Sequence, residues 1–434
     1  MSAEWKQQKI SSLGDFDRGK SKHRPRDAAQ LYGGPYPFIQ TGDITNSNGR
    51  ITSFRQTYSE AGLAQSRLWS AGTLAITIAA NIAETALLTF PACFPDSVVG
   101  FTAHPEKADV RFIEYLFQAM RKQVKSHAYG SAQENINLEV LRKLEFPIPP
   151  LEAQVKIADY LSLLDDRITL LRETNATLEA IAQALFKSWF VDIDPVRAKL
   201  EGRAPEGMDE ATARLFPDSF EESELGLVPR GWRVQSFRET IQIIGGGTPK
   251  TSNPDFWGGD IPWFSVVDAP AITDVFVVDT EKHITEAGLN GSSTKLLPKG
   301  TTIISARGTV GRLALTGCPM TMNQSCYGLR GLAGDSYFTY FSTKRLVEQL
   351  KQRAHGSVFD TITQESFTGV LVCFPRESFI EAFEDNVEPL MLRIRENLMQ
   401  AETLATLRDT LLPRLISGQL RLPEVQATFD AALA

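Results

Sequence analysis

The feature that most constrains the fold of this chain is an internal repeat with an offset of about 226 residues. Four segments of the first half align with four segments of the second half, in the same order and within two residues of that offset. The pairs are YPFIQTGD (36–43) with IPWFSVVD (261–268), GTLAITIAANIAETALL (72–88) with GTTIISARGTVGRLALT (300–316), YGSAQENI (129–136) with HGSVFDTI (355–362), and FPIP (146–149) with VCFP (372–375). Self-similarity at a fixed offset indicates a duplicated structural unit. The sequence therefore predicts two copies of one fold.

Each copy divides into a β-rich part and a long helical part. Short apolar runs such as TLAITIA, TTIISA and VFVVD, bounded by Gly, Pro and Asn, are typical of strands and turns. The expected fold class is α+β, with two β-rich domains separated by a long antiparallel two-helix (coiled-coil) spacer in a pseudo-two-fold internal repeat. The expected boundaries are 1–147 and 229–375 for the β-rich domains, 148–190 and 376–417 for the spacer helices, 191–228 for a linker and 418–434 for a tail.

An apolar heptad seam predicts the spacer helices. Its positions in the first copy are Ile157, Leu161, Leu164, Ile168, Leu171, Asn175, Leu178, Ala182, Leu185 and Trp189. Adding 226 gives Phe383, Val387, Leu390, Ile394, Asn397, Ala401, Leu404, Arg408, Leu411 and Leu415. Pro389 is expected to kink the second helix or to lie in its first turn.

Two matching seams favour packing of the helices on each other, although each helix could instead pack on its own domain. If a two-fold pseudo-axis relates the repeats, the helices are antiparallel and the numbers of paired residues add to a constant, 572. This register places Asn175 opposite Asn397. A polar residue in an apolar seam can specify register, and solvent-exposed asparagines are the alternative.

Charge is distributed unevenly along the chain, whose net charge is −7. The β-rich segments 1–147 and 229–375 carry +3 and +2, whereas 148–228 and 376–434 carry −8 and −4. Basic clusters occur at RGKSKHRPR (18–26), RKQVK (121–125) and RKL (142–144). Such clusters suit phosphate contacts, or else form an ordinary solvated surface. The positive charge is too small for tight DNA binding alone, so a basic partner would have to help.

The cysteines and the hydropathy pattern indicate a cytoplasmic protein. The four cysteines form no C-x-x-C pair and only five histidines are present, so no zinc-ligand spacing occurs. The N-terminal residues have no apolar signal core. No apolar run approaches the roughly 20 residues that span a membrane.

Residues 14–21, GDFDRGKS, fit the phosphate-loop pattern G-x-x-x-x-G-K-[ST]. The preceding KQQKISSL is too polar for a central strand, and Pro25 disfavours the helix that such a loop requires. In the second copy, Thr248 and Pro249 replace Lys20 and Ser21. We therefore expect a glycine loop suited to a nucleic-acid backbone or groove, with Lys20, Lys22, His23 and Arg24 available for contacts.

The chain resembles the specificity subunits of type I restriction–modification systems (the HsdS family) over nearly its whole length. The resemblance is sharpest in FPIPPLEAQVKIADYLSLLDDRI (146–168), ALFKSWFVDIDPVRAKLEGRAPEG (184–207), SELGLVPRGWRV (223–234), GGGTPKTSNPDFWGGDIPWFSVVD (245–268) and LLPRLISGQL (411–420). It implies that the two β-rich domains are target-recognition domains, each of which reads one half of a bipartite DNA site. The paired helices would set the unread gap.

The same resemblance implies a non-catalytic subunit. Its expected partners are double-stranded DNA and two modification (methyltransferase) subunits, which would bind along the acidic helices and the 191–228 segment, with no membrane partner. Two restriction (translocase/nuclease) subunits could join them. S-adenosylmethionine, ATP and Mg would then be bound by the partners, and no cofactor or metal by this chain.

Base reading requires polar side chains on loops that enter a groove. The candidate DNA-binding residues in the first domain are Lys20, Lys22, Arg24, Thr41, Asn81, Tyr129 and Gln133. Those in the second domain are Thr248, Lys250, Ser265, Arg307, Thr309, Arg312 and His355. For each of them, an ordinary turn or surface role is the alternative.

Two other functions fit parts of the sequence. A free-standing tandem DNA-binding regulator would bind a specific site tightly without any partner. A nucleotide-hydrolysing enzyme would lose ATPase activity when Lys20 is replaced by Ala.

Overall fold

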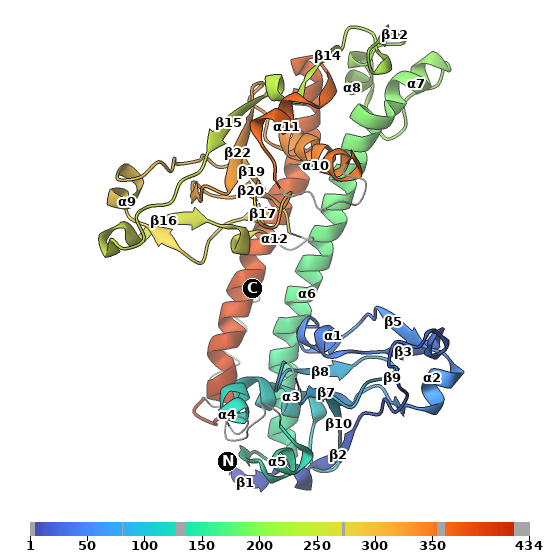
Figure 1. Ribbon diagram of the computed structural model, residues 1–434, viewed down its shortest axis with the longest axis vertical. Coiled ribbons are helices and arrows are strands. Elements are labelled where there is room, and N and C mark those ends of the chain that lie inside the picture. The colour runs from blue at the N-terminus through green and yellow to red at the C-terminus, as the bar shows by residue number, and fades with distance from the viewer. Residues whose placement is uncertain (1–4, 80, 127–135, 271–273, 354–360, 421–434) are drawn as a thin grey trace. The chain divides into compact units, whose positions relative to one another are not determined.

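Two long helices, α6 (Leu151–Lys187) and α12 (Glu377–Ile416), organise the computed structural model (Figure 1). The structure describes residues 5–79, 81–126, 136–270, 274–353 and 361–420. Two compact units divide the chain: one contains Met1–Arg167 with Leu404–Ala434, and the other contains Ile168–Thr403. Each long helix contributes one end to each unit. Among the described residues, no helix has the length and apolarity needed to cross a membrane.

The β-rich part of the first unit is built around a five-stranded sheet. Its strand order is β2 (Gly14–Arg18), β10 (Val98–Ala103), β7 (Leu74–Thr77), β8 (Thr85–Leu88) and β4 (Arg50–Ile51). A second sheet has the order β5 (Gln56–Tyr58), β3 (Tyr32–Phe38), β9 (Ala92–Cys93) and β6 (Leu68–Trp69), and β1 (Lys6–Lys9) pairs with β11 (Glu145–Ile148). The short helices are α1 (Thr41–Thr45), α2 (Glu60–Ala64), α3 (Val110–Ala119), α4 (Arg121–Ser126) and α5 (Leu138–Lys143).

The second unit repeats this topology. Its five-stranded sheet has the order β15 (Ile241–Gly245), β22 (Cys326–Gly331), β19 (Thr302–Ser305), β20 (Leu313–Thr316) and β17 (Phe276–Val277). The smaller sheets are β18 (His283–Ile284), β16 (Trp257–Phe264) and β21 (Thr321–Met322), and the pair β14 (Arg233–Ser236) with β23 (Leu371–Phe374). The helices are α9 (Glu286–Asn290), α10 (Tyr337–Arg353) and α11 (Gln364–Thr368).

Hydrogen bonds confirm the duplication in detail. In both five-stranded sheets the last strand is parallel to its neighbour and the other pairs are antiparallel. Ser59 caps α2 by accepting the amide of Gly62, and Thr285 caps α9 by accepting the amide of Gly288. These caps lie in SEAGL (59–63) and TEAGL (285–289), a fifth pair of matching segments at the same 226-residue offset.

The phosphate-loop pattern lies on a strand. Gly14–Arg18 form β2, which pairs with β10, and residues 22–28, directly after Ser21, form no helix. A phosphate loop requires these residues to form a turn that opens a helix, so the geometry excludes that interpretation here.

A separate segment links the C-terminus of α6 to the second β-rich part. A π-helical turn, Ser188–Asp192, extends α6, and α7 (Asp194–Leu200), α8 (Glu210–Leu215) and the hairpin of β12 (Phe220–Ser223) and β13 (Gly226–Pro229) follow. Phe186, Phe190 and Phe338 pack there with Phe383 of α12 in one buried aromatic cluster. All four cysteines of the chain are free thiols.

The expected antiparallel register of the spacer helices is confirmed in the second unit. The Nδ2 of Asn397 donates to Oδ1 of Asn175 at 2.9 Å, and the Nδ2 of Asn175 donates to the carbonyl oxygen of Ile394 at 3.1 Å. Both asparagine side chains are 1% exposed, so they are not the solvated residues of the alternative interpretation. Trp189 meets Phe383, another expected pair, with ring centroids 6.0 Å apart.

The structure decides two open points about the helices. Helix α12 begins at Glu377 and continues through Pro389, so this proline lies well inside the helix, which excludes the first-turn alternative. Arg408, which interrupts the apolar seam, bonds from Nη1 to Oδ1 of Asp165 at 2.7 Å. Asp165 follows Leu164, the expected seam partner of Arg408, so an ion pair accompanies the polar position of the seam.

We expect replacement of Asn397 by Leu to lower the free energy of unfolding by about 1–3 kcal/mol, because Oδ1 of Asn175 would be left buried without a donor. The double variant Asn175→Leu with Asn397→Leu should recover most of that loss, since both polar partners are removed together. Chemical denaturation of the three proteins provides the measurement. A single variant as stable as the wild type would show that the amide pair does not constrain the register.

Candidate nucleic-acid interface

Each β-rich domain presents one tight loop on an identical hydrogen-bonded frame. In the first domain the amide of Ala83 donates to the carbonyl of Thr77 at 2.9 Å, and in the second the amide of Gly311 donates to the carbonyl of Ser305 at 2.9 Å. Ala83 and Gly311 both have positive φ, 62° and 79°. The hydroxyls of Thr77 and Ser305 both donate across their loops to backbone carbonyls, that of Ser305 to Thr309 at 2.6 Å. The frame is therefore independent of the residues that the loop displays.

The displayed residues differ between the two loops. In the first loop Asn81 is exposed, and its Nδ2 donates to Oγ1 of Thr45 at 3.1 Å. In the second loop Arg307 and Thr309 are exposed, and the side chain of Arg307 bonds to no described residue. Arg312, by contrast, donates from Nη2 to the carbonyls of Ala269 and Pro270, at 3.1 and 2.8 Å. Arg312 thus holds a neighbouring loop in place.

The basic loop of the first domain, residues 19–26, combines fixed and free cations. Arg24 donates from Nη1 to the carbonyls of Ser21 and His23 at 2.7 and 2.8 Å, so its charge stabilises the loop's own backbone. Lys20 and Lys22 are exposed, and their ammonium groups bond to no described residue. The two lysines are therefore the cations of this loop that remain available to a phosphate.

The equivalent loop of the second domain is held by close backbone packing. A Cβ added at Gly246 would lie 1.9 Å from the carbonyl oxygen of Asn323, so glycine is required there. The hydroxyl of Thr248 bonds with Oε1 of Gln324; Gln324 is exposed and Thr248 is half-buried. Lys250 is exposed, with an ammonium group that bonds to no described residue.

Gln324 is a candidate reading residue that the sequence interpretation missed. The feature of the sequence that could have indicated it is the polar pair Asn323–Gln324 between the buried strands β21 and β22. An exposed carboxamide can pair in bidentate fashion with adenine in the major groove.

Of the remaining candidate DNA-binding residues, two lie at the start of short helices and three lie outside the described residues. The hydroxyl and amide of Ser265 both bond with Oδ2 of Asp268, at 2.9 and 2.8 Å, so Ser265 caps a short helical turn. Thr41 begins α1, which Gln40 and Asp43 cap in the equivalent way. Tyr129, Gln133 and His355 lie outside the described residues. All fourteen candidate residues stay predictions as DNA contacts.

Acidic side chains of the first spacer helix hold the basic domain of their own unit. Asp159 pairs with Arg111 at 2.8 Å, and Asp166 pairs with Arg50. The hydroxyl of Tyr115 donates to Oδ2 of Asp165 at 2.5 Å. In the second unit Glu179 of α6 pairs with Lys344 of α10 at 2.7 Å. Part of the acidity of the helices is therefore neutralised within the chain.

One buried and one half-buried carboxylate lie at these junctions. Glu114 on α3 is 3% exposed, and burial raises its pKa to about 8. Glu384 on α12 accepts the amides of Ser336 and Phe338, at 3.2 and 2.7 Å, and so caps the start of α10. Burial raises the pKa of Glu384 to about 7.

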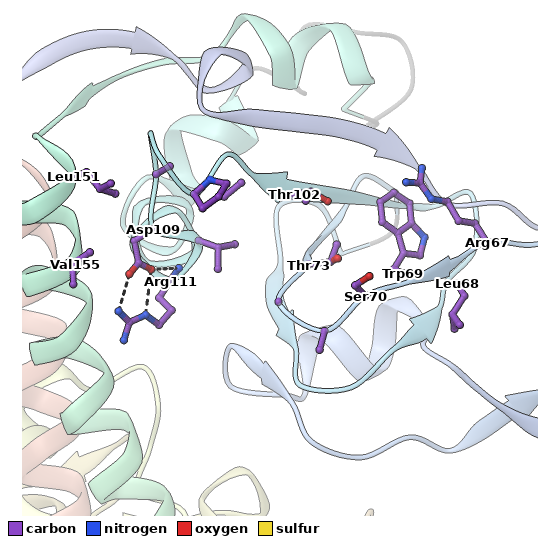
Figure 2. A pocket seen from close by; sticks show the side chains of 16 residues that line it. Arg67, Leu68, Trp69, Ser70, Thr73, Thr102, Asp109, Arg111, Leu151 and Val155 are labelled. Atoms are coloured by element: carbon purple, nitrogen blue, oxygen red, sulfur yellow. Dashed lines mark hydrogen bonds and ion pairs between the residues drawn. The ribbon is translucent and has the colours of Figure 1, made fainter.

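A cavity of about 650 Å³ lies in the first unit between the β6–β7 turn, the start of α3 and the start of α6 (Figure 2). Its charged lining groups are already paired: Arg111 bonds with Asp109, and Arg67 lies over the ring of Trp69 and pairs with Asp17. No histidine or cysteine is among its lining residues.

The duplicated domains, each with variable polar loops on a constant frame, define a tandem recognition protein. The sequence matches the family model "Type I restriction modification DNA specificity domain" over residues 2–180 and 229–376. The chain belongs to this family.

Curated relatives and a solved structure agree with that assignment. The HindI type I restriction enzyme specificity subunit of Haemophilus influenzae is 31% identical over an alignment that spans 66% of this chain and 71% of the relative. The MjaIX specificity subunit of Methanocaldococcus jannaschii is 24% identical over 97% of this chain and 95% of the relative. The fold is similar to that of the type I restriction–modification S subunit from M. genitalium, with a TM-score of 0.56, 17% identity, and coverage of 95% of this chain and 96% of that one.

We expect the buried carboxyl of Glu114 to make the stability of the first unit depend on pH. Its ordinary pKa is 4.5, so between about pH 4.5 and pH 8 the unfolded chain loses a proton that the folded chain keeps. Stability should fall as pH rises through this window, by up to about 1.4 kcal/mol per pH unit. The variant Glu114→Gln should show a flatter profile in thermal or chemical unfolding between pH 5 and pH 8. A profile parallel to that of the wild type would contradict the assignment.

Proposed function

We propose that this chain is the DNA-recognition subunit of a type I restriction–modification complex, in which each β-rich domain reads one half of a bipartite DNA site. The proposal includes a non-catalytic role for the chain itself. Methylation, and any ATP-driven cleavage, would be performed by partner subunits that bind S-adenosylmethionine, ATP and Mg.

The proposal rests on one observation. The two equivalent loops share a hydrogen-bonded backbone frame but expose different side chains. Thr77–Glu84 and Ser305–Arg312 share their backbone hydrogen bonds, yet Asn81 in one loop corresponds to Thr309 in the other. The basic loops differ in the same way, with Lys20 in one domain and Thr248 in the other. Two copies of one scaffold that present different donors and acceptors are suited to read two different half-sites.

The energies required are modest. A good bidentate contact with a base discriminates by about 1–3 kcal/mol, so a few such contacts in each domain suffice for specificity. Phosphate contacts by residues such as Lys20, Lys22 and Lys250 would add affinity without sequence preference. The small positive charge of the domains means that partner subunits must supply the rest of the affinity.

The spacer helices would fix the length of the unread gap. A slip of one heptad would shift one helix by about 10 Å along the other, which corresponds to roughly three base pairs of B-DNA. The buried pair of Asn175 and Asn397 opposes such a slip, because each amide would then face apolar neighbours.

The outer face of the spacer helices is the proposed docking surface for the modification subunits. In the second unit α6 exposes Leu170 and Ile181, at 51% and 46%, and α12 exposes Met399 at 52%. In the first unit α6 exposes Leu163 at 46%. Large apolar residues exposed at helical spacing suit an amphipathic helix of a partner. Because the fold is duplicated, we propose two such subunits for each chain, with restriction subunits as a further pair.

We expect exchange of residues 229–375 for the corresponding domain of another family member to change one half of the methylated site and leave the other half intact. The measurement is genome-wide mapping of methylated adenine in a host that carries the hybrid and its modification subunit. A change in both halves would show that the domains do not read independently. Tight sequence-specific binding by the purified chain alone would favour a free-standing regulator.

Replacement of Lys20 by Ala should weaken DNA binding by the complex and lower the salt slope of log K by about 1, because one phosphate contact is lost. Binding to the cognate duplex at four or more salt concentrations tests this. Lys9→Ala is the matched control, since Lys9 lies on β1, outside the spacer helices and the candidate loops, and pairs with Glu145 at 3.9 Å. Equal slopes for the Lys20 and Lys9 variants would remove Lys20 from the contact residues.

A further inference from the structure

Two adjacent cavities in the second unit lie outside the proposed reading loops and the spacer stripe. One has a volume of about 280 Å³ and the other of about 240 Å³. Both are lined by Phe186, Val191, Arg345 and Gln349, so they form one groove along α10 and the C-terminal end of α6. We call this the α10 groove.

The α10 groove is mainly apolar at its larger end. All four residues of β23, Leu371–Phe374, line this end together with Phe190 and Phe338. At its rim the β12–β13 hairpin exposes Leu225 at 47% and Leu227 at 66%. Strand β23 pairs only with β14 among the described strands, so one of its edges has no strand partner there. An apolar groove beside an open strand edge suits an extended peptide.

Arg345 is the one cation shared by both cavities. Its guanidinium makes no hydrogen bond or ion pair with any described residue, although its neighbours Lys344 and Lys187 are paired with Glu179 and Asp192. Burial lowers the pKa of Arg345, and the charges of Asp192 and Glu348 oppose that effect from a distance. A partly buried guanidinium without a partner is unfavourable unless a carboxylate reaches it.

The duplicated fold places no cation at the position equivalent to Arg345. At the 226-residue offset Arg345 corresponds to Ala119, the last residue of α3, whereas α10 continues to Arg353. The start of α10 shares buried positions with α3, including Phe112 with Phe338, and Leu350 of α10 corresponds to the buried Val124 of the next helix, α4. The first copy keeps these buried positions without a cation, so the shared packing does not account for Arg345.

We propose that the α10 groove binds an apolar segment of a modification subunit whose carboxylate, from an Asp or Glu side chain or from a chain terminus, pairs with Arg345. This inference rests on the proposed function, since it names the partner by that function. The positive charge of Arg345 favours a ligand with an acidic group. The two joined cavities and the exposed leucines at their rim favour an extended apolar ligand such as a peptide. Arginine beside aromatic walls is typical of the residues that contribute most to protein interfaces.

The first test is crosslinking in the reconstituted complex of the full chain with its modification subunit. A photoreactive benzoylphenylalanine at the position of exposed Leu227 should crosslink to a modification-subunit peptide that is apolar and has an acidic group within a few residues. Crosslinks to a second copy of this chain, to a peptide without an acidic group, or to no peptide would overturn the inference.

The second test is charge reversal. Arg345→Glu should weaken association with the modification subunit at least tenfold, and reversal of the crosslinked acidic residue to Lys should restore it. Lys351→Glu is the matched control, because Lys351 is exposed on the same helix and lines neither cavity. The affinity of this variant for the modification subunit should equal that of the wild-type chain. Arg345→Ala introduces the residue found at the equivalent position, Ala119. Its unfolding temperature should equal that of the wild type, which would show that the fold does not require Arg345.

The outcomes separate this inference from the proposed function. Suppose that the wild-type complex assembles and methylates DNA, and that the Arg345→Glu chain binds the modification subunit as tightly as the wild-type chain does. The α10 groove proposal then fails and the proposed function stands. If the wild-type chain binds no modification subunit, the proposed function itself fails.

Discussion

The antiparallel pairing of α6 with α12 is the constraint on which the rest of the protein depends. Apolar seam residues supply the packing energy, but they would tolerate a shift by a heptad. The hydrogen bond between Asn175 and Asn397, with both side chains 1% exposed, makes shifted registers costly because a buried amide without a partner is unfavourable. Arg408 with Asp165 adds a second polar pair in the first unit. Each polar pair therefore opposes a shift of one helix along the other within its own unit.

The spacer helices also hold the domains through charge. Asp159, Asp165 and Asp166 meet Arg111, Tyr115 and Arg50 of the first domain, and Glu179 meets Lys344 of the second. Part of the acidity of the helices therefore binds each basic domain within its own unit. The exposed apolar side chains of the helices are the surface that we propose for partner subunits.

Duplication separates what must stay constant from what can vary. Backbone hydrogen bonds and glycine or positive-φ positions recur in both copies, as at Ala83 and Gly311, because they define the shape of the loops. Side chains at the loop tips and at Arg345 differ, because the fold does not need them. A difference in side chain between equivalent positions of the two copies is therefore a guide to function. Such differences support both the proposed reading of half-sites and the proposed peptide groove.

The sequence by itself determined the repeat, the α+β class, the two spacer helices and the register of Asn175 with Asn397, because heptad period and fixed offset are properties of local order. It could not determine the roles of single polar residues. Arg24, Ser265 and Arg312 looked free in the sequence, yet carbonyls and a carboxylate of the fold engage them. The carbonyl that Arg312 reaches lies 43 residues away, and Gln324 meets Thr248 across 76 residues. Only the tertiary structure decides which side chains remain unpaired, since hydrogen-bond partners are set by proximity in space and not along the chain.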